Sequence, residues 1–155
     1  MSEMMNRNDM PLLRCVVVLR RDLPGWVAAN TAALLAMTLA ARLPDLVGSS
    51  VEDAFGQTHP GMAQLPVTIL GTDHTDLQHV RERLLGTSEI VAEFTRTALE
   101  ARTYAEYARQ LAQTTPSEIE YLGVGVLGDQ KVVRRVTKGL RLYEGANPGP
   151  SGQPQ

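Results

Sequence analysis

Apolar residues along the chain recur at two spacings, and these spacings predict strands that alternate with helices. The apolar run Leu12–Leu19 has the length and composition of a central strand covered on both faces. It is followed by Pro24–Ala41, a stretch without a charged residue. We expect a helix here that begins at Asp22 or Leu23, holds Pro24 in its first turn and ends near Arg42.

The same patterns continue through the rest of the chain. Thr75 and Thr103 each precede a polar residue by three positions, in the capping-box spacing that starts a helix. Apolar residues at helical spacing follow both threonines. Strands are expected at Pro66–Leu70 and Glu89–Thr97, and a closing hairpin around Gly128–Asp129 with strands Ile119–Leu127 and Lys131–Thr137.

The resulting order, β-α-loop-β-α-β-α-β-β, predicts an α/β fold: a three-layer sandwich with a mixed four- to five-stranded sheet. Residues 12–144 form one expected domain, whose length suits a single core. Residues 1–11 are largely polar, and residues 145–155 have no large apolar side chain to bury, so both ends are expected to be disordered. The Pro44–Leu65 connection is much longer than an ordinary loop, which favours a binding loop or lid.

Composition narrows the function classes. Fifteen basic and seventeen acidic residues leave a net charge of -2, so the overall balance points to neither nucleic acid nor an anionic membrane. The single cysteine, Cys15, cannot form an internal disulfide and lies in an apolar strand, which favours an inert core thiol and a cytoplasmic setting. The chargeless Pro24–Ala41 stretch is too rich in Ala and Thr for a membrane span, and a helix buried in a core is expected instead.

Several short motifs occur in the order found in a bacterial family, domain-of-unknown-function family two thousand, which the chain resembles over about Leu12 to Tyr143. The resemblance rests on a VVV strand, an Asp-Leu turn, an Asn in the first helix, an Asp-x-x-Gly-x-x-His loop, a Leu-Gly-Val-Gly strand and a Val-Thr-Lys-Gly-Leu ending. In this chain the motifs are Val16–Val18, Asp22-Leu23, Asn30, Asp53/Gly56/His59, Leu122–Gly125 and Val136–Leu140.

A more distant resemblance links the first strand and helix to the type II peptidyl-tRNA hydrolases. The chain has Arg-Arg-Asp-Leu at 20–23, similar to the hydrolases' Arg-x-Asp-Leu. In the helix that follows, Trp26 stands where the hydrolases have Lys, Asn30 where they have Gln, and Ala33 where they have His. No counterpart of their Asp-Ala-Gly segment occurs near Glu93–Leu99. The resemblance therefore implies a type II peptidyl-tRNA hydrolase-like fold and a homodimer, without the hydrolase's charged groups.

Three residues near the start of the first helix are candidate ligand-binding residues. Asp22 is either a helix cap or a functional carboxylate. Trp26 belongs to the core or a dimer interface, or else forms a stacking platform. Asn30, one turn later on the same face, either bonds a neighbouring backbone group or orients a ligand beneath the long loop.

Asp53 and His59 in the long loop are the candidate catalytic residues and further candidate ligand-binding residues. A carboxylate beside an imidazole can orient its tautomer or raise its basicity, as a general base or half a metal site requires. The alternative is a self-ordered loop in which both side chains bond the loop's own backbone. If the loop closes over the first helix, the pair is expected to face Asn30 across one pocket. His74 and His79 are five residues apart and do not strengthen a metal site.

The sequence contains no nucleophile elbow, P-loop, CxxC or HExxH motif. The glycine-rich segment Gly123–Gly128 lies in a strand and its turn, not at the start of a nucleotide-binding helix. Gly123 and Gly125 share a strand face, which predicts close approach of a helix or a partner backbone. We expect a small cytoplasmic ligand-binding or regulatory protein that forms a homodimer, takes an unknown small molecule and uses no cofactor or metal. The alternatives are an enzyme that uses Asp53 and His59, and a residual peptidyl-tRNA hydrolase-like or RNA-binding activity with a basic patch at Arg20 and Arg21.

Overall fold

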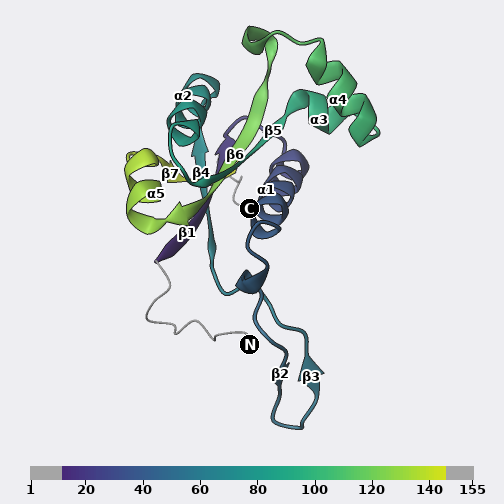
Figure 1. Cartoon of the computed structure of the whole chain (residues 1–155), viewed down its shortest axis with the longest axis vertical. Coiled ribbons are helices and arrows are strands. Elements are labelled where there is room, and N and C mark those ends of the chain that lie inside the picture. The colour runs from purple at the N-terminus through teal and green to yellow at the C-terminus, as the bar shows by residue number, and fades with distance from the viewer. Residues whose placement is uncertain (1–11, 146–155) are drawn as a thin grey trace, which may run out of the picture.

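A five-stranded mixed sheet forms the centre of the computed structural model, which describes residues 12–145 (Figure 1). The strands follow the order β5-β6-β1-β4-β7. Their bounds are β1 Leu13–Arg20, β4 Val67–Thr72, β5 Ile90–Thr95, β6 Tyr121–Asp129 and β7 Arg141–Leu142. The central strand β1 pairs parallel with β4 and antiparallel with β6, so the expected mixed sheet is confirmed.

Helices cover both faces of this sheet, which makes the three layers. α1, Gly25–Ala40, packs on one face, and α2, His74–Leu85, and α5, Gln130–Val136, pack on the other. Alternate residues of β1 divide between the layers: Val17 and Leu19 face α1, whereas Val16 and Val18 face α2 and α5. β1 reads as a continuous apolar run because each of its faces is buried.

The remaining helices are short. α3, Arg96–Glu100, and α4, Tyr104–Ala112, follow β5, and the 3-10 turns η1 and η2 span Pro44–Leu46 and Pro116–Glu118. Thr103 accepts a hydrogen bond from the backbone N–H of Glu106, so the predicted cap of α4 is confirmed. The cap of α2 is Asp73, which accepts from the N–H of Asp76. The expected cap at Thr75 was wrong by two residues.

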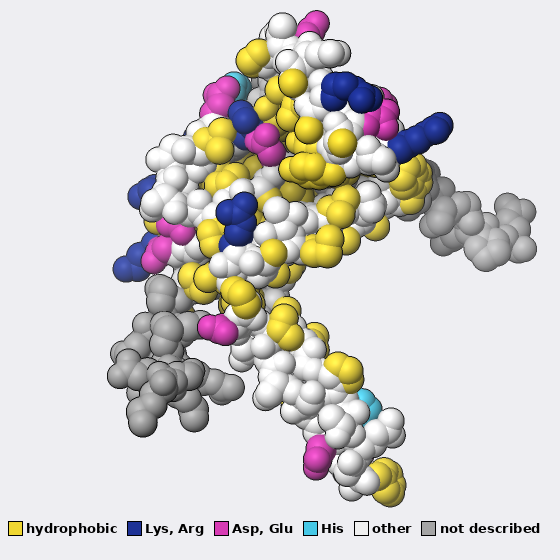
Figure 2. All heavy atoms as spheres, turned by 45° about the vertical axis from the view of Figure 1, so that its right-hand side comes forward, with side chains coloured by type: hydrophobic (Ala, Val, Ile, Leu, Met, Phe, Trp, Pro, Cys, Tyr) yellow, Lys and Arg dark blue, Asp and Glu magenta, His cyan; other side chains and the backbone are white. Residues whose placement is uncertain are grey.

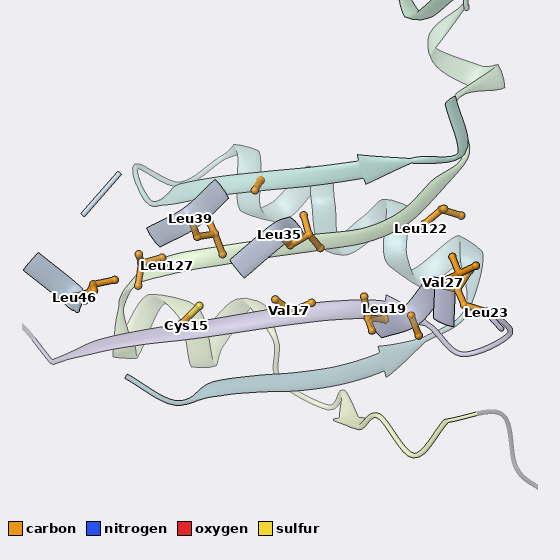
Figure 3. Packing of buried hydrophobic residues seen from close by; sticks show 12 residues of the cluster. Cys15, Val17, Leu19, Leu23, Val27, Leu35, Leu39, Leu46, Leu122 and Leu127 are labelled. Carbon is orange, nitrogen blue, oxygen red and sulfur yellow. The ribbon is translucent and has the colours of Figure 1, made fainter. Parts of the chain in front are cut away.

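Two glycines of β6 let α1 approach the sheet closely. A Cβ atom on Gly123 would lie 2.8 Å from Cγ2 of Thr31, and one on Gly125 would lie 2.9 Å from Cδ1 of Leu39. Figure 3 shows Leu35 and Leu39 of α1 lying against the β6 ribbon in this core. Close approach of a helix, predicted from the glycine spacing, is therefore confirmed.

The expected C-terminal hairpin is wrong. β6 runs to Asp129, and the segment expected to return as a strand is the helix α5. Asp129 accepts hydrogen bonds from the N–H groups of Lys131 and Val132 and so caps that helix. Val133 and Val136, three residues apart, then face the core, and the edge strand β7 comes later.

Between α1 and β4 the chain leaves the body as a hairpin, here called the arm, residues 47–64. Its strands are β2, Val51–Glu52, and β3, Thr58–His59, and Val47 bridges Ala63 at its base. The ten residues 51–60 are all exposed. The arm stands away from the sheet and helices in Figure 1, so the long connection is an ordered projection.

Two expectations from composition have a structural outcome. Cys15 is buried, and burial raises the pKa of its thiol, as an inert core position requires. α1 is not buried on all sides, because Trp26 is 69 % exposed and Met37 64 % exposed on its outer face. Among residues 12–145, no helix combines the length and hydrophobicity needed to cross a membrane. The disorder expected for residues 1–11 and for nearly all of 145–155 falls outside the described residues.

Candidate functional site

Asp53 and His59 meet across the tip of the arm. Nε2 of His59 lies 2.9 Å from Oδ2 of Asp53. The other carboxylate oxygen, Oδ1, accepts hydrogen bonds from the backbone N–H groups of Phe55 and Gln57. The hydrogen bond with His59, followed by those from the two backbone groups, holds the pKa of Asp53 below its usual value.

These contacts build a tight turn. Gly56 has a φ of 79°, a conformation that costs glycine little, and its N–H donates to the carbonyl of Asp53. The Asp-x-x-Gly-x-x-His spacing thus places three residues around one turn: Asp53 as hydrogen-bond acceptor, Gly56 in a left-handed backbone conformation, and His59 as the partner on the opposite strand. Both oxygens of Asp53 bond the arm itself, as the self-ordered loop interpretation expects.

At the start of α1, Asp22 pairs with a cation instead of capping the helix. Arg20 donates to both Asp22 oxygens, at 2.9 and 2.6 Å. The residue before α1 is Pro24, which provides no side-chain hydrogen bond. The expectation that Asp22 caps α1 was wrong, because its carboxylate is held by the arginine two residues earlier.

This ion pair belongs to a larger charge network at the carboxyl end of β1. Arg20 also donates to Glu120 at 2.6 Å, and Arg96 donates to the same carboxylate at 3.1 Å. The hydrogen bond from Arg96 first, and that from Arg20 as well, lowers the pKa of Glu120. Arg21 donates to the carbonyl of Gly71. The charge of Arg20 is therefore balanced by two carboxylates.

Trp26 and Asn30 both lie exposed on the outer face of α1. Asn30 is ten residues before the end of the helix, about 15 Å along its axis, and the arm leaves the body beyond that end (Figure 1). The chain thus brings Asp53 to His59 and Asp22 to Arg20, but it does not bring the arm's pair to Asn30. Within the part of the chain that the structure describes, the cavity beside His59 is lined by arm residues alone. The shared pocket expected for these groups does not form within one chain.

A second concavity, beside α1, is a groove of about 410 Å³ that lies between α1, β5, α3 and α4, here called the α1–α4 groove. Aromatic and apolar side chains supply most of its wall, together with one carboxylate, Glu93, and one cation, Arg102. The lining residues used below are Leu34, Phe94, Arg102, Tyr104 and Tyr107.

The aromatic rings of the groove are arranged to receive a flat apolar group. Tyr104 and Tyr107 pack edge to face, with ring centroids 5.6 Å apart. Tyr104 is 82 % exposed, so its ring is available at the mouth. Partial burial, and then the nearby Glu93, raises the pKa of Tyr107, which keeps its hydroxyl protonated and able to donate a hydrogen bond.

Of the two charged side chains that line the groove, Glu93 has an ion-pair partner among the described residues and Arg102 does not. Glu93 forms an ion pair with Arg81, which does not line the groove. The guanidinium of Arg102 forms no ion pair with any residue between 12 and 145. An exposed cation beside aromatic rings can bind an anionic group of a ligand.

Sequence reasoning missed this groove. Helical spacing places Tyr104 and Tyr107 on one side of a helix, and nothing in the sequence indicates that Phe94, in a separate strand, lies beside them. Residues 101–104, Ala-Arg-Thr-Tyr, place a cation and an aromatic ring close together at a helix start, and this is the signal in the sequence that could have indicated a binding site here. Within the described residues no group of three or more His, Cys, Asp or Glu side chains could hold a metal ion.

Comparisons with known proteins show the family. No curated protein matches the chain. The solved structure of Atu0240, a protein of unknown function from Agrobacterium tumefaciens strain C58, is similar with a TM-score of 0.78 and 22 % identity. The match covers 86 % of this chain and 99 % of that one, and shows a shared fold. A family model described as "Protein of unknown function (DUF2000)" matches residues 13–144, and the chain therefore belongs to the DUF2000 family.

Proposed function

We propose that this protein binds a small molecule that has a flat apolar body and an anionic group, and that the α1–α4 groove is its site. The observation that carries the proposal is the pairing of aromatic rings with Arg102, a cation without an ion-pair partner among residues 12–145. Ligand sites commonly combine apolar walls with a few polar groups that fix orientation. Phe94 and Tyr104 would contact the apolar body, and Arg102 would pair with the anion.

A binding role fits the side chains better than a catalytic one. Both oxygens of Asp53 are already hydrogen-bonded within the arm, and among the described residues His59 is the one titratable group that lines the cavity beside it. The hydroxyl groups of the groove belong to tyrosines and threonines, and its carboxylate, Glu93, is held by Arg81 and forms no hydrogen bond with these hydroxyls. We therefore assign Asp53 and His59 to the architecture of the arm.

The anionic fluorophore 8-anilinonaphthalene-1-sulfonate is a suitable probe, because it joins aromatic rings to a sulfonate and brightens in apolar surroundings. We expect saturable binding to the folded wild-type protein, weakened at least fivefold in Arg102→Gln and in Tyr104→Ala. Arg109→Gln removes the same charge from α4 outside the groove lining and should leave binding unchanged. Nile red, a neutral dye, should respond to Tyr104→Ala but not to Arg102→Gln. Equal binding by all the variants would overturn the proposal.

We further propose that the fold is of the type II peptidyl-tRNA hydrolase kind and that cleavage activity has been lost. Trp26, Asn30 and Ala33 stand where those enzymes have Lys, Gln and His, and all three are exposed on α1. Arg20, expected in a basic patch for RNA, is paired with Asp22 and Glu120. Purified protein should release no more tRNA from a peptidyl-tRNA substrate than a control without enzyme. Turnover that disappears in Asn30→Ala or Asp22→Ala would contradict this.

A further inference from the structure

We propose that two copies of this chain form a dimer by exchanging arms, so that the arm of each copy lies along the outer face of α1 of the other. This inference is independent of the ligand of the α1–α4 groove. It specifies which surfaces make the homodimer and commits the exposed face of α1 to one occupant, the arm of a second copy.

The first observation is an ordered arm that has no support from its own body. Residues 51–60 are all exposed, yet the hairpin is closed by backbone hydrogen bonds from Gly48 to Met62 and from Asp53 to Gln57. Gly61 fits because a Cβ there would overlap the carbonyl of Gly48. An isolated two-stranded hairpin has little stability of its own in water, which indicates that a surface packs against it.

The second observation is the side chain that the tip presents. Asp53, Gly56 and His59 build a turn whose most exposed member is Phe55, at 100 % exposure. Met62, further down the arm, is 79 % exposed, and Val51 is also exposed. Figure 2 shows the arm with a hydrophobic group at its end. A phenylalanine held out in this way is typical of an interface anchor.

The third observation is an uncharged receiving surface. Along α1, the exposed positions include Trp26, Ala33 and Met37, and the helix contains no charged residue. Ordinary surface helices carry charge on their outer face. Figure 2 shows hydrophobic side chains gathered on the body in the view that brings the α1 and α4 side forward. Small alanines between the larger side chains leave room for a strand pair to lie close.

Length and charge match the two surfaces. From Val47 to Phe55 the arm spans eight residues, about 26 Å at the rise of a strand. From Trp26 to Met37 the helix face spans about 17 Å, so one arm covers it fully. The arm carries Glu52 and Asp53 and no Lys or Arg. The receiving face is bordered by Arg42, just after α1, which forms no ion pair with any residue that the structure describes.

A second copy, rather than a different protein, satisfies both surfaces at once. Each chain offers one arm and one face, so a two-fold axis buries two arms against two faces and leaves neither exposed. The exchange also brings Asp53 and His59 near the α1 face that carries Asn30, a juxtaposition that a single chain does not make.

Sedimentation velocity of the full chain at micromolar concentration tests the proposal. Wild-type protein should sediment with twice the 16.9 kDa chain mass. Phe55→Ser and Ala33→Glu should each sediment as the single chain, with unchanged circular dichroism because both sites are exposed. Leu85→Ser, an exposed apolar position on α2 across the sheet, should remain a dimer.

Cysteine cross-linking tells arm exchange from other dimers. The Ala54→Cys chain, which places a cysteine at the exposed arm tip and keeps Phe55, is mixed with a chain that carries Cys at Ala29, Ala33 or Met37, and the mixture is oxidised gently. The native Cys15 is buried and should not compete. A disulfide between the tip cysteine and at least one helix position is the expected result. A wild-type monomer, or a dimer that survives Phe55→Ser and cross-links only from helix to helix, would overturn the proposal.

Discussion

Gly123 should be the least replaceable glycine of the sheet, and Gly123→Ala tests the packing of α1 directly. The new methyl group would meet Cγ2 of Thr31 at 2.8 Å, Cδ2 of Leu19 at 2.9 Å and Cδ1 of Leu35 at 3.0 Å. Ordinary carbon contacts lie at about 3.5–4.0 Å, so neighbours on both β1 and α1 must move by about half an ångström or more. These neighbours are themselves buried and cannot turn to solvent.

The expected cost follows from two opposing terms. Overpacking a close-packed core costs about 1–3 kcal/mol. Replacing glycine by alanine lowers the conformational entropy of the unfolded chain, which stabilises the folded protein by about 0.4–1 kcal/mol. The net destabilisation should therefore be about 1–2 kcal/mol. Gly125→Ala should cost less, because its sub-3 Å contact is with a single atom, Cδ1 of Leu39.

Urea unfolding followed by far-ultraviolet circular dichroism is the appropriate assay, because Trp26 is largely exposed and its fluorescence reports little of the core. Gly25→Ala is the matched control, since a Cβ there meets nothing within 4 Å. Adding Thr31→Ser to Gly123→Ala removes the nearest methyl group and should recover part of the loss. A Gly123→Ala protein as stable as Gly25→Ala would refute the packing argument.

Three further predictions concern buried and capped groups. Thr31→Val should stabilise the protein by about 1 kcal/mol, measured by urea unfolding, because the buried Thr31 hydroxyl has no hydrogen-bond partner among residues 12–145; a loss of stability would contradict this. Asp129→Ala should cost about 0.5–2 kcal/mol in the same assay, whereas Asp129→Asn, which keeps the cap, should cost less. Glu120 has a lowered pKa, so its contribution is present above the unfolded value near 4.3 and is lost as pH falls through the lower folded value. Thermal melts from pH 6 to pH 3 should therefore show a smaller loss for Glu120→Gln than for wild type, and parallel curves would exclude this contribution.

The elements that the sequence predicted well are those in which one pattern had one interpretation. β1 is predicted as a strand because it is apolar on both faces. Thr103 caps α4 through a hydrogen bond with Glu106, only three residues further along the chain. At Gly128–Asp129 the local pattern favours a hairpin, and the deciding contact is remote. The carboxylate of Glu89, forty residues away, accepts from the N–H of Asp129 and fills the space that a side chain at Gly128 would need.

The candidate site was predictable in its parts and not in its assembly. The Asp53–His59 pair was predicted from one loop, because the two residues are six apart and meet across one turn. The α1–α4 groove combines Leu34, Phe94 and Tyr104 from separate elements. Helical periodicity shows that α4 has an apolar side, but it does not show whether that side is covered. Tertiary geometry decides which apolar stripe becomes core and which becomes a cavity wall.

The position of the arm also determines how the chain would tolerate being cut. A break after Phe55 leaves one fragment with β1 and α1 and another with β4, β5, β6 and β7. Because β1 lies between β6 and β4, neither fragment holds a continuous sheet, and the larger one has a gap where its central strand belongs. The arm tip is thus a natural division for a split protein. We expect each half to be unfolded alone and to recover the native sheet when the two are mixed, because insertion of β1 restores both of its ladders.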